Sequence, residues 1–67
     1  MVDRIRAILA RLAIAERIED IDLPEYHLHE LKGGRKGTWS VTVRGNWRIT
    51  FRFESGYASN VNFEDYH

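Results

Sequence analysis

Residues 27–38, HLHELKGGRKGT, gather side chains suited to proton transfer and to phosphate binding. Histidine can give or take a proton near neutral pH, because its unperturbed pKa is about 6.5. Lysine and arginine bind phosphate oxygens, and the planar arginine fork can hold two of them at once. Acid–base cleavage of RNA needs such groups: a base for the 2′-hydroxyl proton, an acid for the leaving 5′-oxygen, and fixed cations for the phosphate.

The chain supplies a complete set of candidates for this chemistry. They are His29, Lys32, Arg35 and Lys36 in this stretch, Arg48 further along, and Asp65, Tyr66 and His67 at the end. Each also has a plain structural explanation. His29 can be a surface residue of a strand, Lys32 and Arg35 can simply keep a loop hydrated, and His67 can be a chain end without a role. The glycines do not form a nucleotide-binding loop, because no helix follows them.

Charge is distributed unevenly, although the chain of 67 residues has a formal net charge of zero. Zero net charge argues against a generic nucleic-acid binder. The middle of the chain, residues 27–52, nevertheless holds six lysines and arginines against a single acidic residue, Glu30. Arg44 and Arg52 belong to this basic block. It predicts either an RNA-binding face or a face that is merely solvated.

An amphipathic helix is predicted near the N-terminus. Ile5, Ile8, Leu9 and Leu12 follow the i, i+3, i+4, i+7 spacing of one helix face. The next apolar residues, Ile14, Ile18 and Ile21, fit a short turn or a kinked continuation, and Pro24 ends it. Packing in a core is the expected role of all these residues.

From Tyr26 onward the apolar period changes to two, which predicts strands. The residues around Tyr26 to Leu31 suggest a short strand that runs into the glycine loop. TWSVTV, WRITFRF and YASNVNF then alternate apolar and polar positions, as half-buried antiparallel strands do. The fold class is therefore α+β, with an N-terminal helix packed on a small antiparallel sheet of three to four strands.

The register of the two hairpins is predicted from the requirement that paired residues lie on the same face, apolar with apolar and polar with polar. Three-residue loops, 44–46 and 54–56, pair Val43 with Trp47 and Phe53 with Tyr57, and place Asn46 and Gly56 in the left-handed conformation. Thr42, Arg48 and Asn62 then line up on the polar face, with Arg44 and Arg52 nearby. The opposite face packs on the helix and consists of Trp39, Val41, Trp47, Ile49, Phe51, Val61 and Phe63. Both tryptophans are expected in the core rather than as stacking platforms for bases.

Composition bounds the remaining possibilities. The length suits a single domain, and there is no cysteine to form a disulfide or a thiolate zinc site. No histidine spacing typical of a metal site occurs, so neither a metal nor a cofactor is expected. No apolar run is long enough to span a bilayer, and the charged opening is unlike a signal peptide. The expectation is a soluble cytoplasmic protein without a membrane partner.

Three motifs taken in order resemble the HigB-type toxins, or plasmid-maintenance killer proteins, of the RelE/ParE superfamily. They are LHELKGGRKGTWSV, GNWRITFRF and the closing NFEDYH. The resemblance covers residues 18–67 and extends weakly to the helix before them. Its motifs are specific, because the tryptophan, the arginine and the final tetrapeptide recur in the family at fixed spacing.

The resemblance implies a ribosome-dependent mRNA endonuclease that is neutralised by a HigA-type helix-turn-helix antitoxin. The family's catalytic positions fall on His29, Lys32, Arg48, Asp65, Tyr66 and His67. His67 or His29 would exchange protons, Lys32 and Arg48 would hold the phosphate, Tyr66 would stack on or orient the nucleotide, and Asp65 would tune a histidine or bind the base. Arg35, Lys36, Arg44 and Arg52 are the expected RNA-binding residues.

The sequence departs from the family pattern at two places. Glu30 stands where the motif usually has proline, and residues 1–67 form one toxin domain without the basic N-terminal strand and helix of full-length relatives. We therefore expect a partner, a second copy or the antitoxin, to cover an exposed sheet edge or helix face. An alternative function is a catalytically weak or inactive toxin that only binds antitoxin. Gyrase poisoning, as in ParE relatives, fits the EDYH ending less well.

Overall fold

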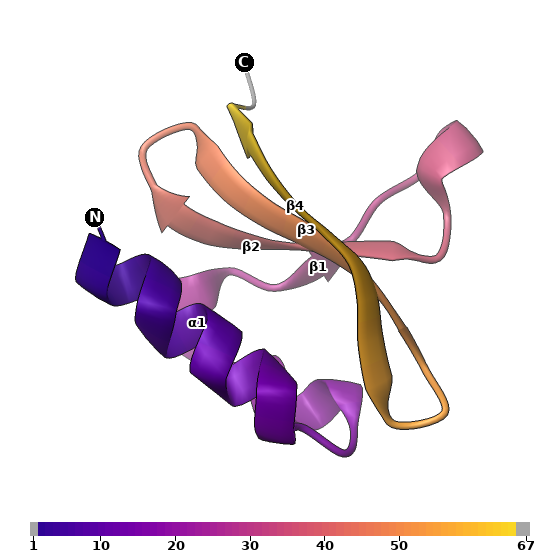
Figure 1. Cartoon of the computed structure of the whole chain (residues 1–67). Helices are drawn as coiled ribbons and strands as arrows, with labels where there is room; N and C mark the ends of the chain where they lie inside the picture. The colour runs from indigo at the N-terminus through magenta and orange to yellow at the C-terminus, as the bar shows by residue number, and fades with distance from the viewer. Residues whose placement is uncertain (1, 66–67) are drawn as a thin grey trace.

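The computed structural model describes residues 2–65 and consists of one helix packed on a four-stranded antiparallel sheet. Helix α1 spans Val2–Ile14, and the strands are β1 (His29–Glu30), β2 (Thr38–Arg44), β3 (Trp47–Glu54) and β4 (Tyr57–Asp65). Three short 3₁₀ turns connect them, η1 (Ile18–Ile21), η2 (Pro24–Tyr26) and η3 (Gly33–Arg35). The sheet order is β1-β2-β3-β4, which confirms the predicted α+β class (Figure 1).

The core lies between α1 and one face of the sheet. Ile8 and Leu12 from the helix are buried against side chains of β2 and β3, among which Phe51 is fully buried. The connection after the helix adds Ile21 and Tyr26 to the same cluster. The predicted helix is confirmed, except that Leu9 is 43% exposed and Ile14 is 78% exposed. Both tryptophans are half-buried and pack against this core, as expected.

The first hairpin turns differently from the prediction but reaches the predicted register. Its loop has two residues, Gly45 and Asn46, and pairs Arg44 with Trp47. A bulge between Thr42 and Arg44 then restores the pairing of Thr42 with Arg48. Gly45, rather than Asn46, has a positive φ, of 56°. The extra residue therefore sits in the strand as a bulge and not in the loop.

The second hairpin corrects the prediction further. Ser55 and Gly56 form a two-residue turn and both have positive φ, as a type I′ turn requires. An irregularity opposite residues 50–52, where Asn60 has φ 50°, shifts the outer part of β4. Arg48 therefore pairs with Glu64, and Asn62 pairs with Thr50. The predicted pairing of Arg48 with Asn62 was wrong by two residues.

The shifted register also changes what β4 contributes to the core. Ala58 packs against the core, whereas Val61 and Phe63 are 44% and 45% exposed and lie outside it, contrary to the prediction. Phe63 instead stacks flat on Trp47, with ring centroids 4.6 Å apart. An apolar groove runs between α1 and this edge strand, lined by Leu9, Leu12, Ala13, Ala58 and Val61. The partner predicted for this edge stays a prediction.

The chain between α1 and β2 is less regular than the sequence suggested. Asp20 joins the helix to η1, because its carboxylate accepts the backbone N–H groups of Glu16 and Arg17. These hydrogen bonds lower the pKa of Asp20. Tyr26 lies in η2 and not in a strand, and only His29 and Glu30 pair with β2. Across residues 2–65 no helix has the length and apolar character needed to cross a membrane.

Candidate active site

The sheet face opposite α1 carries polar residues in three rows. Thr42, Arg48 and Glu64 form the first row, and His29, Ser40, Thr50 and Asn62 form the second. Thr38 and Arg52 begin the third. The Cα atoms of His29 and Thr50 are about 10 Å apart, because two strand spacings separate them. The fold therefore brings His29 and Arg48 to one face, on neighbouring rows.

This face is not simply solvated. Ser40 and Thr50 are each only 1% exposed, although both alternate with residues of the apolar core. Leu31 is also buried but does not belong to the core beneath α1. It lies two residues after His29, and therefore on the polar side of the sheet. The loop that follows Leu31 thus shields part of the polar face, on the side of the sheet away from α1 (Figure 1).

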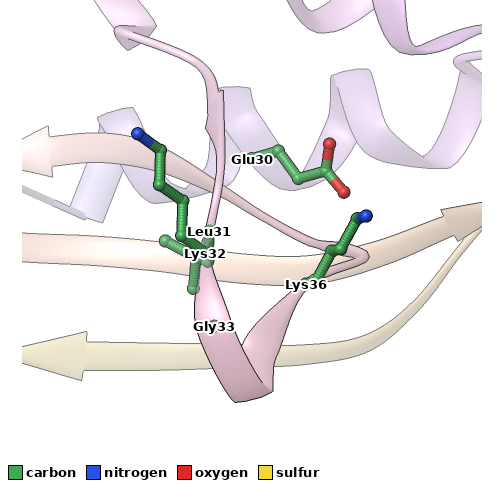
Figure 2. A pocket seen from close by; sticks show the side chains of 5 residues that line it. All are labelled: Glu30, Leu31, Lys32, Gly33 and Lys36. Atoms are coloured by element: carbon green, nitrogen blue, oxygen red, sulfur yellow. The ribbon is translucent and has the colours of Figure 1, made fainter.

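A hollow of about 390 Å³ lies beside this loop. Glu30, Leu31, Lys32, Gly33 and Lys36 line it. Figure 2 shows that the Glu30 carboxylate and the Lys36 ammonium point toward one another, while Lys32 extends away from both. Both lysines are exposed. Lys32 is thus a cation of this loop that is directed away from Glu30, as a phosphate ligand should be.

Two hydrogen bonds from backbone N–H groups hold the loop in its conformation. The Lys36 N–H donates to the Gly33 carbonyl, and the Gly37 N–H donates to Glu30 Oε2 at 3.0 Å. Gly37 has φ 94°, and a Cβ there would stand 3.1 Å from the Arg52 guanidinium. Glu30 therefore closes the base of the loop, a role that the proline of the family motif could not fill.

Arg48 is half-buried on β3, and its guanidinium is held at one end. Its Nη1 donates to the Gly45 carbonyl at 2.9 Å, which fixes the side chain beside the first hairpin. An arginine has five N–H donors, so most remain for a phosphate. The predicted central position of Arg48 is confirmed, with Glu64 as its neighbour on β4.

His29 is exposed, and its ring Nδ1 lies 3.2 Å from the carbonyl oxygen of His27. A carbonyl can only accept a hydrogen bond, so this contact requires the proton on Nδ1. The neutral ring then carries its lone pair on Nε2. His29 is thus placed to accept a proton through Nε2.

The remaining predicted residues are spread around these groups. Asp65 ends β4 opposite Trp47 and is exposed, and Arg44 is exposed at the end of β2. Arg52 pairs with Glu54 at 3.1 Å. Tyr66 and His67 lie outside the described residues.

Sequence reasoning missed Glu64, which is the most constrained acidic group of this face. Arg35 donates two hydrogen bonds to it, at 3.0 and 2.6 Å, and the Thr50 hydroxyl donates a third. These donors lower the pKa of Glu64 from 4.5 to about 2, with Arg35 the larger cause. The predicted RNA-binding Arg35 is therefore already engaged by a carboxylate. The register error of two residues removed Glu64 from the predicted row of Arg48.

Because of Glu64, the free energy of unfolding should decrease at acidic pH. Its folded-state pKa is depressed, so its contribution is present above pH 4.5 and is lost as the pH falls toward 2. Solvent reaches both partners, which are 46% and 26% exposed, so we expect Glu64→Gln to cost about 1–2 kcal/mol at pH 6. The free energy of unfolding, measured by urea denaturation, should differ less between the two proteins at pH 3. A difference that stays constant from pH 6 to pH 3 would contradict this origin.

The sequence of this chain is similar to those of known toxins. Residues 1–67 match the family model described as the RelE-like toxin of type II toxin–antitoxin system HigB. A relative, the endoribonuclease HigB of Proteus vulgaris, is 52% identical over 66 residues, which cover 98% of this chain and 72% of the relative. With a match over its whole length and this degree of identity, the chain belongs to the HigB family of toxins of type II toxin–antitoxin systems.

Proposed function

We propose that this protein is the toxin of a type II toxin–antitoxin pair and acts as an endoribonuclease that cleaves mRNA on the ribosome. The observation that carries the proposal is the polar face of the sheet. It presents a histidine with an available Nε2 and a fixed arginine on neighbouring rows, with Lys32 at the adjoining loop. The 52% identity to a protein named as an endoribonuclease supports the same reaction.

The proposed reaction is an attack within the RNA. A base removes the proton of a 2′-hydroxyl, whose oxygen then attacks the adjacent phosphorus, and the bond to the 5′-oxygen of the next nucleotide breaks. An acid protonates that leaving oxygen, which gives a 2′,3′-cyclic phosphate and a 5′-hydroxyl end. Arg48 and Lys32 hold the negative charge of the phosphate as it increases in the transition state.

Other residues are proposed to transfer the protons and to bind the nucleotide. His29 and His67 exchange the protons, Tyr66 orients the nucleotide, and Asp65 tunes a histidine or binds the base. Lys36, Arg44 and Arg52 contact the RNA backbone as exposed or half-buried cations. The partner is a helix-turn-helix antitoxin of the HigA type, and the reaction takes place where ribosomes translate, in the cytoplasm.

Ribosome dependence is tested by comparing one mRNA under two conditions. We expect purified protein to cut the message within codons when ribosomes translate it, and to leave it intact when ribosomes are absent. Primer extension maps the ends, and the 2′,3′-cyclic phosphate is identified by mass spectrometry. Equal cleavage of naked mRNA would refute the dependence. Binding to the antitoxin with no cleavage under either condition would favour the alternative of a regulatory module.

A further inference from the structure

The loop of residues 32–37 is tied to the sheet at two separate points. At its base, Glu30 accepts the N–H of Gly37 at 3.0 Å. At its other side, the Arg35 guanidinium spans the polar face to β4 and holds both carboxylate oxygens of Glu64. The first contact closes the loop on itself. The second is the one that fixes the loop relative to β4, the strand that ends at Asp65.

Glu64 is itself anchored to the centre of the sheet. Its Oε2 accepts the hydroxyl of Thr50, which lies on β3 between two neighbouring strands and is 1% exposed. The same oxygen accepts the shorter hydrogen bond from Arg35. A carboxylate that is bound on both sides cannot follow a moving loop without breaking a contact to the sheet. The set Thr50–Glu64–Arg35 is therefore a continuous link from the rigid sheet to the loop.

We propose that the Arg35–Glu64 pair positions the loop that carries Lys32, and so sets the distance between this lysine and Arg48 for the cleavage reaction. Arg48 and Glu64 are direct partners across β3 and β4, and Lys32 begins the turn that contains Arg35. The pair thus relates two phosphate-binding cations without touching the substrate. This inference rests on the proposed function, since it assigns the pair a role in that reaction.

A direct RNA contact by Arg35 is the competing explanation, and the geometry disfavours it. The two ends of its fork are already used by Glu64, and a phosphate would have to displace a carboxylate that Thr50 also holds. The two explanations predict opposite effects of removing the Glu64 charge. Loss of a positioning pair lowers the turnover rate, whereas release of an RNA-binding arginine strengthens RNA binding.

The test uses Glu64→Gln, Arg35→Ala and the double variant Arg35→Ala/Glu64→Gln in the full chain. We expect each single change to lower kcat about tenfold with KM altered less than twofold, because a misplaced cation weakens the transition state more than the ground state. The double variant should be no slower than the worse single variant, since both changes break one link. Amide hydrogen exchange at Lys36 and Gly37 should accelerate about tenfold in Glu64→Gln, without ribosomes or RNA present.

Glu54→Gln is the matched control, because it removes the same charge from a second ion pair, Arg52–Glu54, which lies within one strand. It should leave kcat and the exchange of the loop amides unchanged. A fall in KM for Glu64→Gln with kcat retained, additive effects in the double variant, or unchanged loop exchange would each overturn the positioning role. The exchange measurement needs no cleavage, so failure of the proposed function, seen as a wild-type protein that cuts nothing on ribosomes, is distinguishable from failure of this inference.

Discussion

Arg48→Ala is expected to reduce kcat/KM for mRNA cleavage by about 10²–10³-fold, because it removes a fixed cation from the position where phosphate charge increases. The structure supports so large an effect through the placement of this side chain. It is half-buried on the strand at the centre of the hairpins, and the Gly45 carbonyl holds one end of its guanidinium. An arginine held in this way loses little freedom when it binds the transition state.

Two further variants distinguish this role from loss of structure. Arg48→Lys keeps the charge but lacks the planar fork, so it should stay at least about tenfold below the wild type. Arg6→Ala removes an exposed arginine from α1, on the other side of the sheet, and should leave cleavage unchanged. The thermal midpoint of each variant is measured alongside the rate. Cleavage within threefold of wild type by a folded Arg48→Ala protein would remove Arg48 from the site.

Much of the fold follows from the spacing of apolar residues. The period of 3.6 in residues 3–13 and the period of two in the three later segments predicted the helix and the strands that the structure contains. The pairing of Thr42 with Arg48 was also predictable, because a shift of one residue would place apolar side chains on the polar face. The spacing of apolar residues is therefore sufficient to predict a helix or a strand when one face of that element is buried.

The bulges were not predictable in this way. β2 has an extra residue at Val43, and β4 has one near Asn60. The strand segments before and after such a bulge each alternate normally, so the alternation of apolar and polar residues does not show where the bulge lies. For β2 the error was confined to the turn. For β4 it moved the partner of Arg48 from Asn62 to Glu64, so an acidic residue at the centre of the site was not predicted.

The candidate site was predicted as a list of residues but not as an arrangement. His29, Lys32 and Arg48 were identified from their chemistry and from the family motif, and the structure places His29 and Arg48 on one face, with Lys32 in the loop after β1. The pair of Arg35 with Glu64 depends on a contact between residues 29 positions apart. It also depends on the loop folding back over the sheet. No local pattern encodes such a contact, so Arg35 and Lys36 were assigned the same RNA-binding role.

The second large effect concerns the two histidines. The contact of Nδ1 with the His27 carbonyl leaves Nε2 of His29 as the lone-pair nitrogen, so we expect His29 to act as the base and His67 as the acid. His67→Ala and His29→Ala should each lower kcat by about 10²–10⁴-fold with an ordinary RNA.

A substrate with sulfur in place of the leaving 5′-oxygen separates the two roles, because a thiolate leaves without being protonated. The sulfur substrate should restore cleavage by His67→Ala to near that of the wild-type protein on the same substrate. It should not rescue His29→Ala, because the 2′-hydroxyl must still lose its proton. Rescue of His29→Ala alone would exchange the two assignments. His27→Ala, which removes an exposed neighbouring imidazole but keeps the backbone carbonyl that orients His29, is the matched control and should cleave both substrates normally.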